Sequence, residues 1–217
     1  MSMHKFDPKH HARLDDPARR KILNPEEILR KAELRPGLVV CDIGCGTGFF
    51  TLAAARMAGE KGLVYGVDSS AEMLELLRKR LAGDGQTAGD GTMAGGGQTA
   101  GGERADGGRP DNIQLVLSQE LAIPLPDRTA DFAFMSNVLH EITQRSSFLQ
   151  EVHRLVRPGG TVTVVDWVAA PTEAGPPVED RLPKEQASEL LKQAGFRVVK
   201  EFEAGPFHYG VTALKPA

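Results

Sequence analysis

The chain has 217 residues, 41% of them hydrophobic and 25% charged, and this length and balance predict one compact domain with a buried core. Its formal net charge is -3 and it has no long block of Lys and Arg, which disfavours nucleic acid as a partner. No leader-like apolar segment opens the chain and no run of about 18 apolar residues occurs, so we expect a cytoplasmic protein with no membrane partner.

Residues 1–23 form an N-terminal arm in which apolar residues follow no clear period among Pro, His and Arg. We expect this arm to fold as a lid over the pocket of the domain formed by residues 24–217. Three histidines in a polar arm are more often solvated than bound to a metal, so we predict no metal site at His4, His10 and His11.

A regular alternation of helices and strands begins after the arm. Asn24 followed by Pro25 and Glu27 is typical of a helix start, and Ser69 with Glu72 forms a capping box for a later helix. Apolar, β-branched runs predict buried strands between the helices. In chain order we expect a helix at 24–34, a strand at 38–42, a helix at 49–58, a strand at 63–68 and a helix at 69–82. Such alternation is typical of a parallel sheet.

Residues 83–110 interrupt this alternation with Gly, Asp, Thr and Ala, and the sequence Gly-Gln-Thr-Ala-Gly occurs in them twice. This composition cannot bury enough apolar surface to offset the entropy lost on ordering, so it predicts a disordered surface loop. A phosphate-binding loop is disfavoured, because the insert has no strand-to-helix turn and no Lys followed by Ser or Thr.

The alternation resumes after the insert and ends in two apolar runs separated by Ala204-Gly205-Pro206, which predict an antiparallel pair. We expect further strands at 113–117, 131–138, 161–167, 196–202 and 207–214, and helices around 148–156 and 184–194. The predicted fold is α/β, with a single doubly wound, seven-stranded Rossmann-like sheet that is mostly parallel and has one antiparallel strand near the C-terminus.

A glycine-rich motif connects the first predicted strand to the next helix and runs from Asp42 to Gly48. Its glycines stand at first, third and fifth places, whereas a dinucleotide fingerprint needs the sixth place, which Phe49 occupies. Hydride chemistry with NAD is therefore disfavoured. The two cysteines, Cys41 and Cys45, lie in this motif with no second pair at metal-ligand spacing, so we expect both to be buried and reduced.

This motif resembles the nucleotide-binding loop of class I S-adenosylmethionine (SAM)-dependent methyltransferases, which has an acid, a spacer and then Gly-x-Gly-x-Gly. Asp68 at the end of the second predicted strand matches the acid that binds ribose in that family. Three further segments, at 123–127, 137–141 and 155–160, look like the menaquinone/ubiquinone-biosynthesis and small-molecule branch. The resemblance implies SAM as methyl donor and S-adenosylhomocysteine as product.

The resemblance also implies roles for individual residues. Asp42 and Gly44 would hold the methionine amino end, Asp68 would bind ribose, and Ser69 and Met73 would lie near the adenine. Where this branch commonly has an Asp that contacts the adenine amino group, this chain has Gln119 followed by Glu120. The full set of expected cofactor-binding residues is Asp42, Gly44, Cys45, Gly46, Thr47, Gly48, Asp68, Ser69, Met73, Gln119, Glu120 and Asn137.

Catalytic candidates follow the fourth predicted strand. A sulfonium already activates its methyl group, so a base is needed only if the acceptor must lose a proton. His140 and Glu141 are placed to act as this base, and the alternative is that His140 packs against the following segment. Asp166 and Trp167 end the fifth strand at the same carboxyl edge, where Trp167 either walls the acceptor pocket or belongs to the edge of the core.

The sequence therefore predicts an enzyme, a SAM-dependent methyltransferase that acts on a small-molecule acceptor by in-line displacement and is a monomer or homodimer. Two alternatives stay open: C-methylation of a quinone precursor, and SAM binding without catalysis. A nucleic-acid methyltransferase is disfavoured, because Ser136-Asn137-Val138-Leu139 replaces the Asn-Pro-Pro-aromatic motif of base-amino enzymes. Arsenite methylation is disfavoured, because no cysteine follows Cys45.

Overall fold

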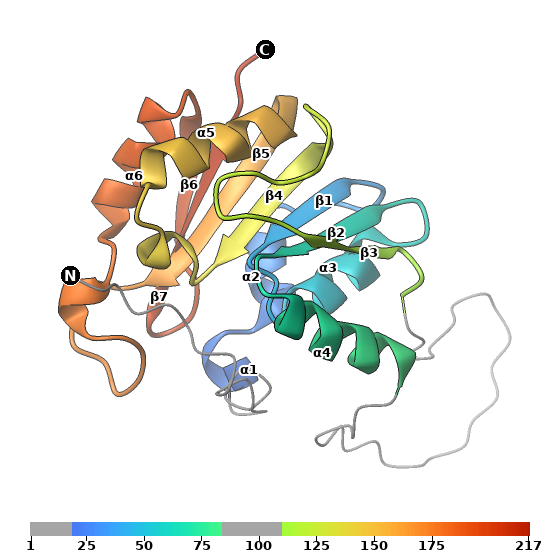
Figure 1. The fold of residues 1–217 in the computed structure, drawn as a ribbon. Coiled ribbons are helices and arrows are strands. Elements are labelled where there is room, and N and C mark those ends of the chain that lie inside the picture. Colours follow the sequence, from blue (N-terminus) through green and yellow to red (C-terminus); the bar gives the residue numbers. More distant parts are fainter. Residues whose placement is uncertain (1–18, 84–109) are drawn as a thin grey trace, which may run out of the picture.

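The computed structural model describes residues 19–83 and 110–217 (Figure 1). Residues 1–18, with the three arm histidines, and residues 84–109 of the glycine-rich insert lie outside the described residues, so the predictions made for them stay predictions. The described residues form one seven-stranded sheet with helices on both faces (Figure 1).

The sheet has the strand order β3-β2-β1-β4-β5-β7-β6. Neighbouring strands in the described part are parallel except for β7, which runs antiparallel to both β5 and β6. The predicted doubly wound sheet with one antiparallel strand near the C-terminus is thus confirmed. The strands are β1 (Val39–Ile43), β2 (Leu63–Asp68), β3 (Ile113–Leu117), β4 (Ala130–Ser136), β5 (Val156–Trp167), β6 (Arg197–Glu203) and β7 (His208–Leu214).

Two layers of helices bury the two faces of the sheet. Val40 and Phe132 belong to the core cluster that includes α2 and α3, whereas their chain neighbours Cys41 and Ala133 belong to the cluster that includes α5 and α6, as the two-residue period of a strand requires. The helices are α1 (Arg19–Ile22), α2 (Pro25–Lys31), α3 (Thr51–Ala58), α4 (Ala71–Ala82), α5 (Arg145–Leu155) and α6 (Lys184–Gln193), with 3-10 turns η2 (Leu139–Glu141) and η3 (Val178–Asp180). Among the described helices, none has both the length and the apolar character needed to cross a membrane.

The last residues of the N-terminal arm pack into the domain. Leu23 is buried in the same core cluster as Ile28 of α2. The guanidinium of Arg19 lies 4.1 Å from the centroid of the Phe49 ring, in the segment that follows β1. Residues 19–23 therefore lie beside the glycine-rich motif, although the sequence showed no helical period here.

Strand β5 starts five residues earlier than the Thr161 start expected from the sequence, directly after α5. The Pro-Gly-Gly segment was expected to separate the two elements. In the structure Gly159 N donates to Lys215 O and Lys215 N donates to Gly160 O, both over 2.9 Å. These two bonds hold the segment against Lys215 although Gly159 has a φ of 77°, and the pairing of β4 with β5 shifts register between Ala130 and Phe132.

Several other boundaries differ by one to three residues from those expected. Helix α4 has Ser70 rather than Ser69 as its N-cap, because Ser70 Oγ accepts the 3.2 Å hydrogen bond from Met73 N. Helix α2 ends at Lys31 and is followed by Glu33, which has a positive φ of 65°. Strand β4 ends at Ser136, because Asn137 has a φ of 60° and turns the chain out of the sheet.

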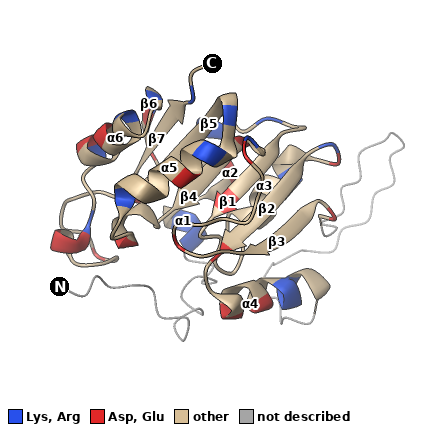
Figure 2. Cartoon of the chain, turned by 45° about the horizontal axis from the view of Figure 1, so that its top comes forward, with Lys and Arg blue, Asp and Glu red and all other residues tan. Residues whose placement is uncertain are grey.

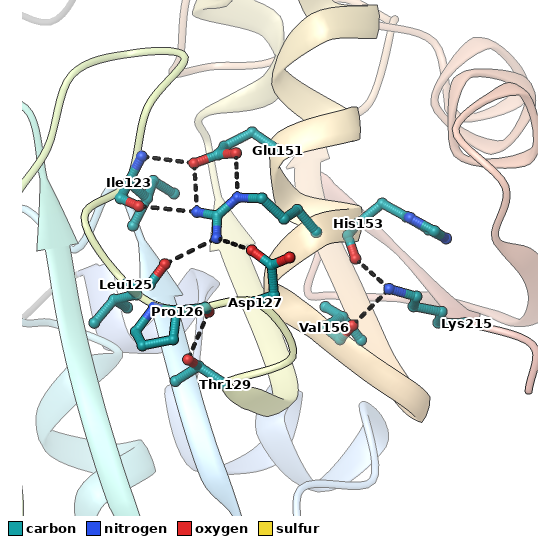
Figure 3. A network of polar contacts seen from close by, with 10 residues as sticks. Ile123, Leu125, Pro126, Asp127, Thr129, Glu151, His153, Val156 and Lys215 are labelled. Atoms are coloured by element: carbon teal, nitrogen blue, oxygen red, sulfur yellow. Dashed lines mark hydrogen bonds and ion pairs between the residues drawn. The ribbon is translucent and has the colours of Figure 1, made fainter.

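Arg154 of α5 connects that helix to the segment after β3, and Figure 3 shows the oxygens around it. Its guanidinium donates to the carbonyls of Ile123 and Leu125 and to the carboxylates of Asp127 and Glu151 over 2.7–2.9 Å. Glu151 also accepts the Ile123 N–H at 2.7 Å. The planar fork of an arginine matches this arrangement, since it supplies several donors in fixed directions.

Arg154→Lys is expected to lower the free energy of unfolding by about 1–3 kcal/mol, because an ammonium cannot reach two carbonyls and two carboxylates at once. For a chain of this size that loss lowers Tm by several degrees, which thermal unfolding monitored by circular dichroism will measure. Arg78→Lys is the control, because Arg78 pairs only with Glu75 in the described contacts and its side chain is 62% exposed. Equal Tm values for the two variants would contradict a structural role for Arg154.

Candidate active site

The loop between β1 and α3 contains three glycines that all have left-handed backbone. Gly44, Gly46 and Gly48 have φ values of 73°, 53° and 88°. Residues with a Cβ rarely adopt this conformation, so the spacing of the glycines follows from the path of the loop. Gly44 N and Cys45 N donate to Val67 O at 2.8 and 3.0 Å, which ties the loop to the end of β2.

The loop also touches two other elements closely. A Cβ added at Gly44 would overlap Cγ2 of Val138, in the segment after β4. A Cβ added at Gly48 would overlap Cδ1 of Leu77 in α4. The glycines therefore allow both the conformation of the loop and its contact with the segment that holds the predicted catalytic residues.

Asp42, the acid of the motif, is buried below the loop. Its Oδ2 accepts a 2.6 Å hydrogen bond from Thr51 Oγ1 in α3. Burial raises the pKa of Asp42 to about 7, and the Asp68 charge adds to this rise, whereas the Thr51 hydrogen bond and the Arg19 charge oppose it. A cation bound near this loop would favour the ionised carboxylate.

Asp68 lies at the end of β2 and faces the loop. Its Oδ2 accepts from Gly46 N and its Oδ1 accepts from Ser70 N, each over 2.8 Å. Burial raises the pKa of Asp68, although these backbone hydrogen bonds oppose the rise. An ionised carboxylate only accepts hydrogen bonds, and its two oxygens match a pair of neighbouring hydroxyls.

The remaining predicted cofactor residues lie near the glycine loop and Asp68. Ser69 is exposed and Met73 is 4% exposed in α4. Ser118 N donates to Asp68 O at 2.9 Å, which places the segment with Gln119 and Glu120 next to the end of β2. The structure thus brings the predicted residues of the loop, β2, α4 and the end of β3 to one edge of the sheet.

Two predicted loop residues, Cys45 and Thr47, are buried. Cys45 packs against Leu74 and Leu77 in a small core cluster, and Thr47 is 3% exposed with its carbonyl accepting from Arg80 at 3.3 Å. Both cysteines are buried and form no disulfide, as predicted, and burial raises the pKa of each thiol. Burial and the raised pKa both lower the share of reactive thiolate at each cysteine.

His140 lies in η2, and its ring contacts a carboxylate that the sequence did not connect to it. The Nδ1 atom is 2.7 Å from Asp166 Oδ1, and the backbone N–H donates to Asp166 Oδ2 at 3.2 Å. Burial alone lowers the pKa of His140, but the hydrogen bond and charge of Asp166 and the charge of Glu141 more than offset this, so the pKa is raised. Glu141 Oε1 lies 3.8 Å from Nε2.

Arg145 holds the turn that carries His140. Its guanidinium donates to Leu139 O and His140 O, each at 3.0 Å. The ring and the backbone of His140 are therefore held from two sides, by Asp166 of β5 and by Arg145 of α5. Besides any packing against the following segment, the ring thus has a hydrogen bond to a carboxylate that is 0% exposed.

Trp167 and His208 lie next to Asp166 at the carboxyl end of β5, where their rings contact each other. Their ring centroids are 4.0 Å apart, and Gly175 lies so close to the indole that an added Cβ would come within 2.8 Å of it. Arg181 donates to the carbonyls of Val168, Ala170, Ala174 and Pro176, which holds the loop after β5 in place. Trp167 thus belongs to the packed edge of the sheet rather than to an open wall.

Polar atoms without hydrogen-bond partners gather at this edge. Ser136 Oγ, Asn137 Oδ1 and both ring nitrogens of His208 are buried and accept or donate no hydrogen bond within the described residues. Burial lowers the pKa of His208 to about 3, so its ring is neutral. Leaving buried polar groups unpaired is costly, which marks this edge as a place for a polar ligand.

Comparison with known proteins decides the family. The family model described as "Methyltransferase domain" matches residues 41–164, which is more than half of the chain. The chain belongs to the methyltransferase-domain family. Its fold and glycine loop also agree with the class I SAM-dependent methyltransferases that the sequence resembled.

This methyltransferase-domain protein is 32% identical to a solved SAM-dependent methyltransferase from Aquifex aeolicus, which superposes with a TM-score of 0.83 over 97% of this chain and 100% of that chain. The demethylmenaquinone methyltransferase of Geobacillus stearothermophilus is 26% identical over 72% of this chain and 56% of the relative. The ubiquinone/menaquinone biosynthesis C-methyltransferase of Hahella chejuensis is 30% identical over 63% of this chain and 46% of the relative. The chain spans about half the length of these curated relatives.

Proposed function

We propose that this protein is an enzyme that transfers a methyl group from SAM to a small molecule. The observation that carries the proposal is the pairing of the glycine loop with Asp68, whose Oδ2 accepts from Gly46 N of the loop while its Oδ1 accepts from Ser70 N before α4. Membership of the methyltransferase-domain family and the likeness to the Aquifex aeolicus methyltransferase support it.

The residues present fit SAM. Asp68 would accept both ribose hydroxyls, and the backbone around Gly44 and Gly46 would hold the methionine end, where the ionised form of Asp42 balances positive charge. Ser69, Met73, Gln119 and Glu120 would surround the adenine, and the unpaired Asn137 Oδ1 is available to a donor group. When bound, SAM supplies a methyl group on a sulfonium, whose sulfur keeps the electron pair of the broken bond as S-adenosylhomocysteine leaves.

The residues of the protein would orient the acceptor and accept its proton. The loop and the segment after β4 touch at Gly44 and Val138, so donor and acceptor sites adjoin. Correct alignment of two reactants supplies much of the rate in such a displacement. His140 and Glu141 lie two and three residues after Val138 and are the proposed groups for proton transfer.

A small acceptor is favoured over nucleic acid by the distribution of charge. Lys and Arg are interspersed with Asp and Glu on α5 and α6, and on α4 a short basic run follows two Glu, so the basic residues form no long stripe on these helices (Figure 2). C-methylation of a quinone precursor is the second candidate, because the curated relatives from Geobacillus and Hahella bear such names. We retain the cytoplasm as the proposed location, and residues 1–23 as the proposed lid of the domain at 24–217.

Calorimetric titration of SAM into the wild-type protein and into Asp68→Asn tests the proposal. We expect saturable wild-type binding, and a loss of about 1–3 kcal/mol in the variant because a charged acceptor is replaced by an amide. Asp111→Asn is the matched control. Asp111 is exposed and precedes β3, so it lies at the amino-terminal ends of the strands, whereas Asp68 lies at their carboxyl ends. Absence of wild-type binding, or equal weakening in both variants, would remove the proposal.

A further inference from the structure

We propose that His208 and Arg19 bind a carboxylate group of the methyl acceptor, so that the protein selects small anionic acceptors. The carboxylate lies at the start of β7, and the methyl-accepting end of the molecule lies at the end of β4, beside the glycine loop. This inference rests on the proposed methyltransferase function and extends it by assigning an acceptor class and the two residues that recognise it.

The sheet places three side chains of this edge on one of its faces. Phe134 and Val165 belong to the core cluster that includes α2 and α3. Because side chains alternate along a strand, Ser136 and Trp167 lie on that same face, two residues further along β4 and β5. His208 is the register partner of Trp167, so its side chain shares this face.

His208 is a buried polar residue of this face with no hydrogen-bond partner. Its ring contacts Trp167, the residue is 2% exposed, and neither ring nitrogen has a partner within the described residues. Burial lowers the pKa of His208 to about 3, so the ring is neutral and one of its nitrogens carries an N–H donor. An unpaired buried donor is costly, and an acceptor atom of a ligand removes that cost.

Positive charge surrounds the unpaired ring. Besides burial, the charges of three side chains lower the pKa of His208, and these are Arg19, Arg181 and His140. Asp166 balances His140, since its Oδ1 lies 2.7 Å from the Nδ1 of that ring. Arg181 donates to four carbonyls of the loop after β5 and so contributes its charge to the site. The field at the ring therefore favours an anionic ligand.

Helix α1 holds Arg19 between the glycine loop and the start of β7. The Arg19 guanidinium lies over the Phe49 ring, 4.1 Å from its centroid. At the other end of the helix, Ile22 O packs so closely on Gly205, before β7, that an added Cβ would overlap it. In Figure 1, α1 lies below the ends of the arrows of β4 and β5. A guanidinium stacked on a ring keeps N–H groups at its edge for a carboxylate.

The spacing of the polar groups sets the orientation of the acceptor. Ser136, whose Oγ also has no partner in the described part of the chain, is two strands and two residues away from His208 in register. Their Cα atoms are therefore about 12 Å apart. Ser136 comes just before Val138, which touches the glycine loop at Gly44. A small acceptor held by its carboxylate at His208 thus has its other end beside the donor.

The donors at this place suit a carboxylate better than a phosphate. His208 supplies one N–H, and Arg19 supplies a charged planar fork, which together match the two oxygens and single charge of a carboxylate. A phosphate presents three oxygens and nearly two charges, so it needs more donors than these two side chains give.

Binding of carboxylates to protein saturated with S-adenosylhomocysteine tests the inference. Phenylacetate and hexanoate are titrated beside phenylacetamide and hexanamide, which match them in shape and lack the charge. Trp167 is the only tryptophan of the chain and its ring centroid is 4.0 Å from that of His208, so its fluorescence reports binding. We expect each carboxylate to bind about tenfold or more tightly than its amide.

Two variants separate recognition from structure. His208→Phe keeps an aromatic ring in place and removes both unpaired nitrogens, so Tm should stay the same or rise while the preference for carboxylates is lost. Arg19→Met keeps an apolar stem over Phe49 and removes the charge, with the same loss of preference. Arg20→Met is the control, because Arg20 pairs with Glu26 and its side chain is 49% exposed, so the preference should remain.

Equal binding of carboxylates and amides by the wild-type protein, or no saturable binding of either carboxylate, would overturn the inference. A preference that survives in both variants would do the same. So would a preference that appears only without S-adenosylhomocysteine, because Arg19 would then bind the donor's own carboxylate. Titration with SAM keeps the two proposals apart. SAM binding without a carboxylate preference refutes only the acceptor class, whereas a carboxylate preference without SAM binding refutes the proposed function.

Discussion

Gly44→Ala is expected to weaken SAM binding roughly tenfold or more while the sheet still forms. Gly44 has a φ of 73°, and an added Cβ would overlap Val138 Cγ2. The left-handed conformation costs an alanine about 1–2 kcal/mol, and the overlap forces the loop away from the segment after β4. This contact joins the proposed donor and acceptor sites. The calorimetric Kd for SAM should therefore rise about tenfold or more, while the Tm changes by only a few degrees.

Gly37→Ala separates the two effects. Gly37 has a φ of 83°, but an added Cβ there meets nothing within 4 Å. This control carries the conformational cost without the overlap, so its Kd for SAM should equal that of the wild-type protein. Adding Val138→Ala to Gly44→Ala removes the colliding methyl and should restore part of the affinity. A double variant that binds no better than Gly44→Ala would show that the contact with Val138 does not matter.

Asp42→Asn should make the ligand-free protein more stable near about pH 8, because it removes a buried charge. Burial raises the pKa of folded Asp42 to about 7, whereas the unfolded chain has an ordinary carboxyl pKa. The folded state therefore holds the proton more tightly, so the contribution of this group is greatest below about pH 4 and is lost as pH rises to about 7. Each pKa unit corresponds to about 1.4 kcal/mol, so the gain is a few kcal/mol.

Unfolding by urea at several pH values measures this gain. Asparagine keeps an oxygen that can accept the Thr51 hydrogen bond, so the variant should retain the fold. The wild-type protein should lose stability relative to Asp42→Asn as pH rises through about 4–7. Parallel curves for the two proteins would show that Asp42 has no raised pKa.

The same substitution should weaken SAM binding, because the proposed ligand is a cation that favours the ionised carboxylate. Wild-type affinity should rise between about pH 6 and 8 as proton loss from Asp42 ceases to oppose binding, and the variant should lack this part of the slope. The amino group of SAM titrates near about pH 8, so only the difference between the two proteins reports Asp42. Calorimetry in two buffers with different ionisation heats measures the proton released.

Local signals allowed most elements to be predicted. The strands can be predicted because apolar, β-branched runs alternate with amphipathic helices. The predicted N-cap role of Asn24 is confirmed, since its side chain accepts a 3.2 Å hydrogen bond from Glu27 N. The errors fell where distant contacts override local preference. β5 extends across Pro158 and Gly159 because Lys215 forms backbone hydrogen bonds with this segment. The residues close to the segment in the chain do not indicate that partner.

The sequence by itself determined the α/β class, the antiparallel strand near the C-terminus and the glycine loop, because each depends on residues that are close in the chain. Only the tertiary structure decided that Asp166 contacts His140, since these residues are 26 positions apart and meet because β4 and β5 are parallel neighbours. The raised pKa of Asp42 also depends on the tertiary structure, because its largest cause is burial. Burial and the register between strands are properties of the assembled sheet, so no local pattern contains them.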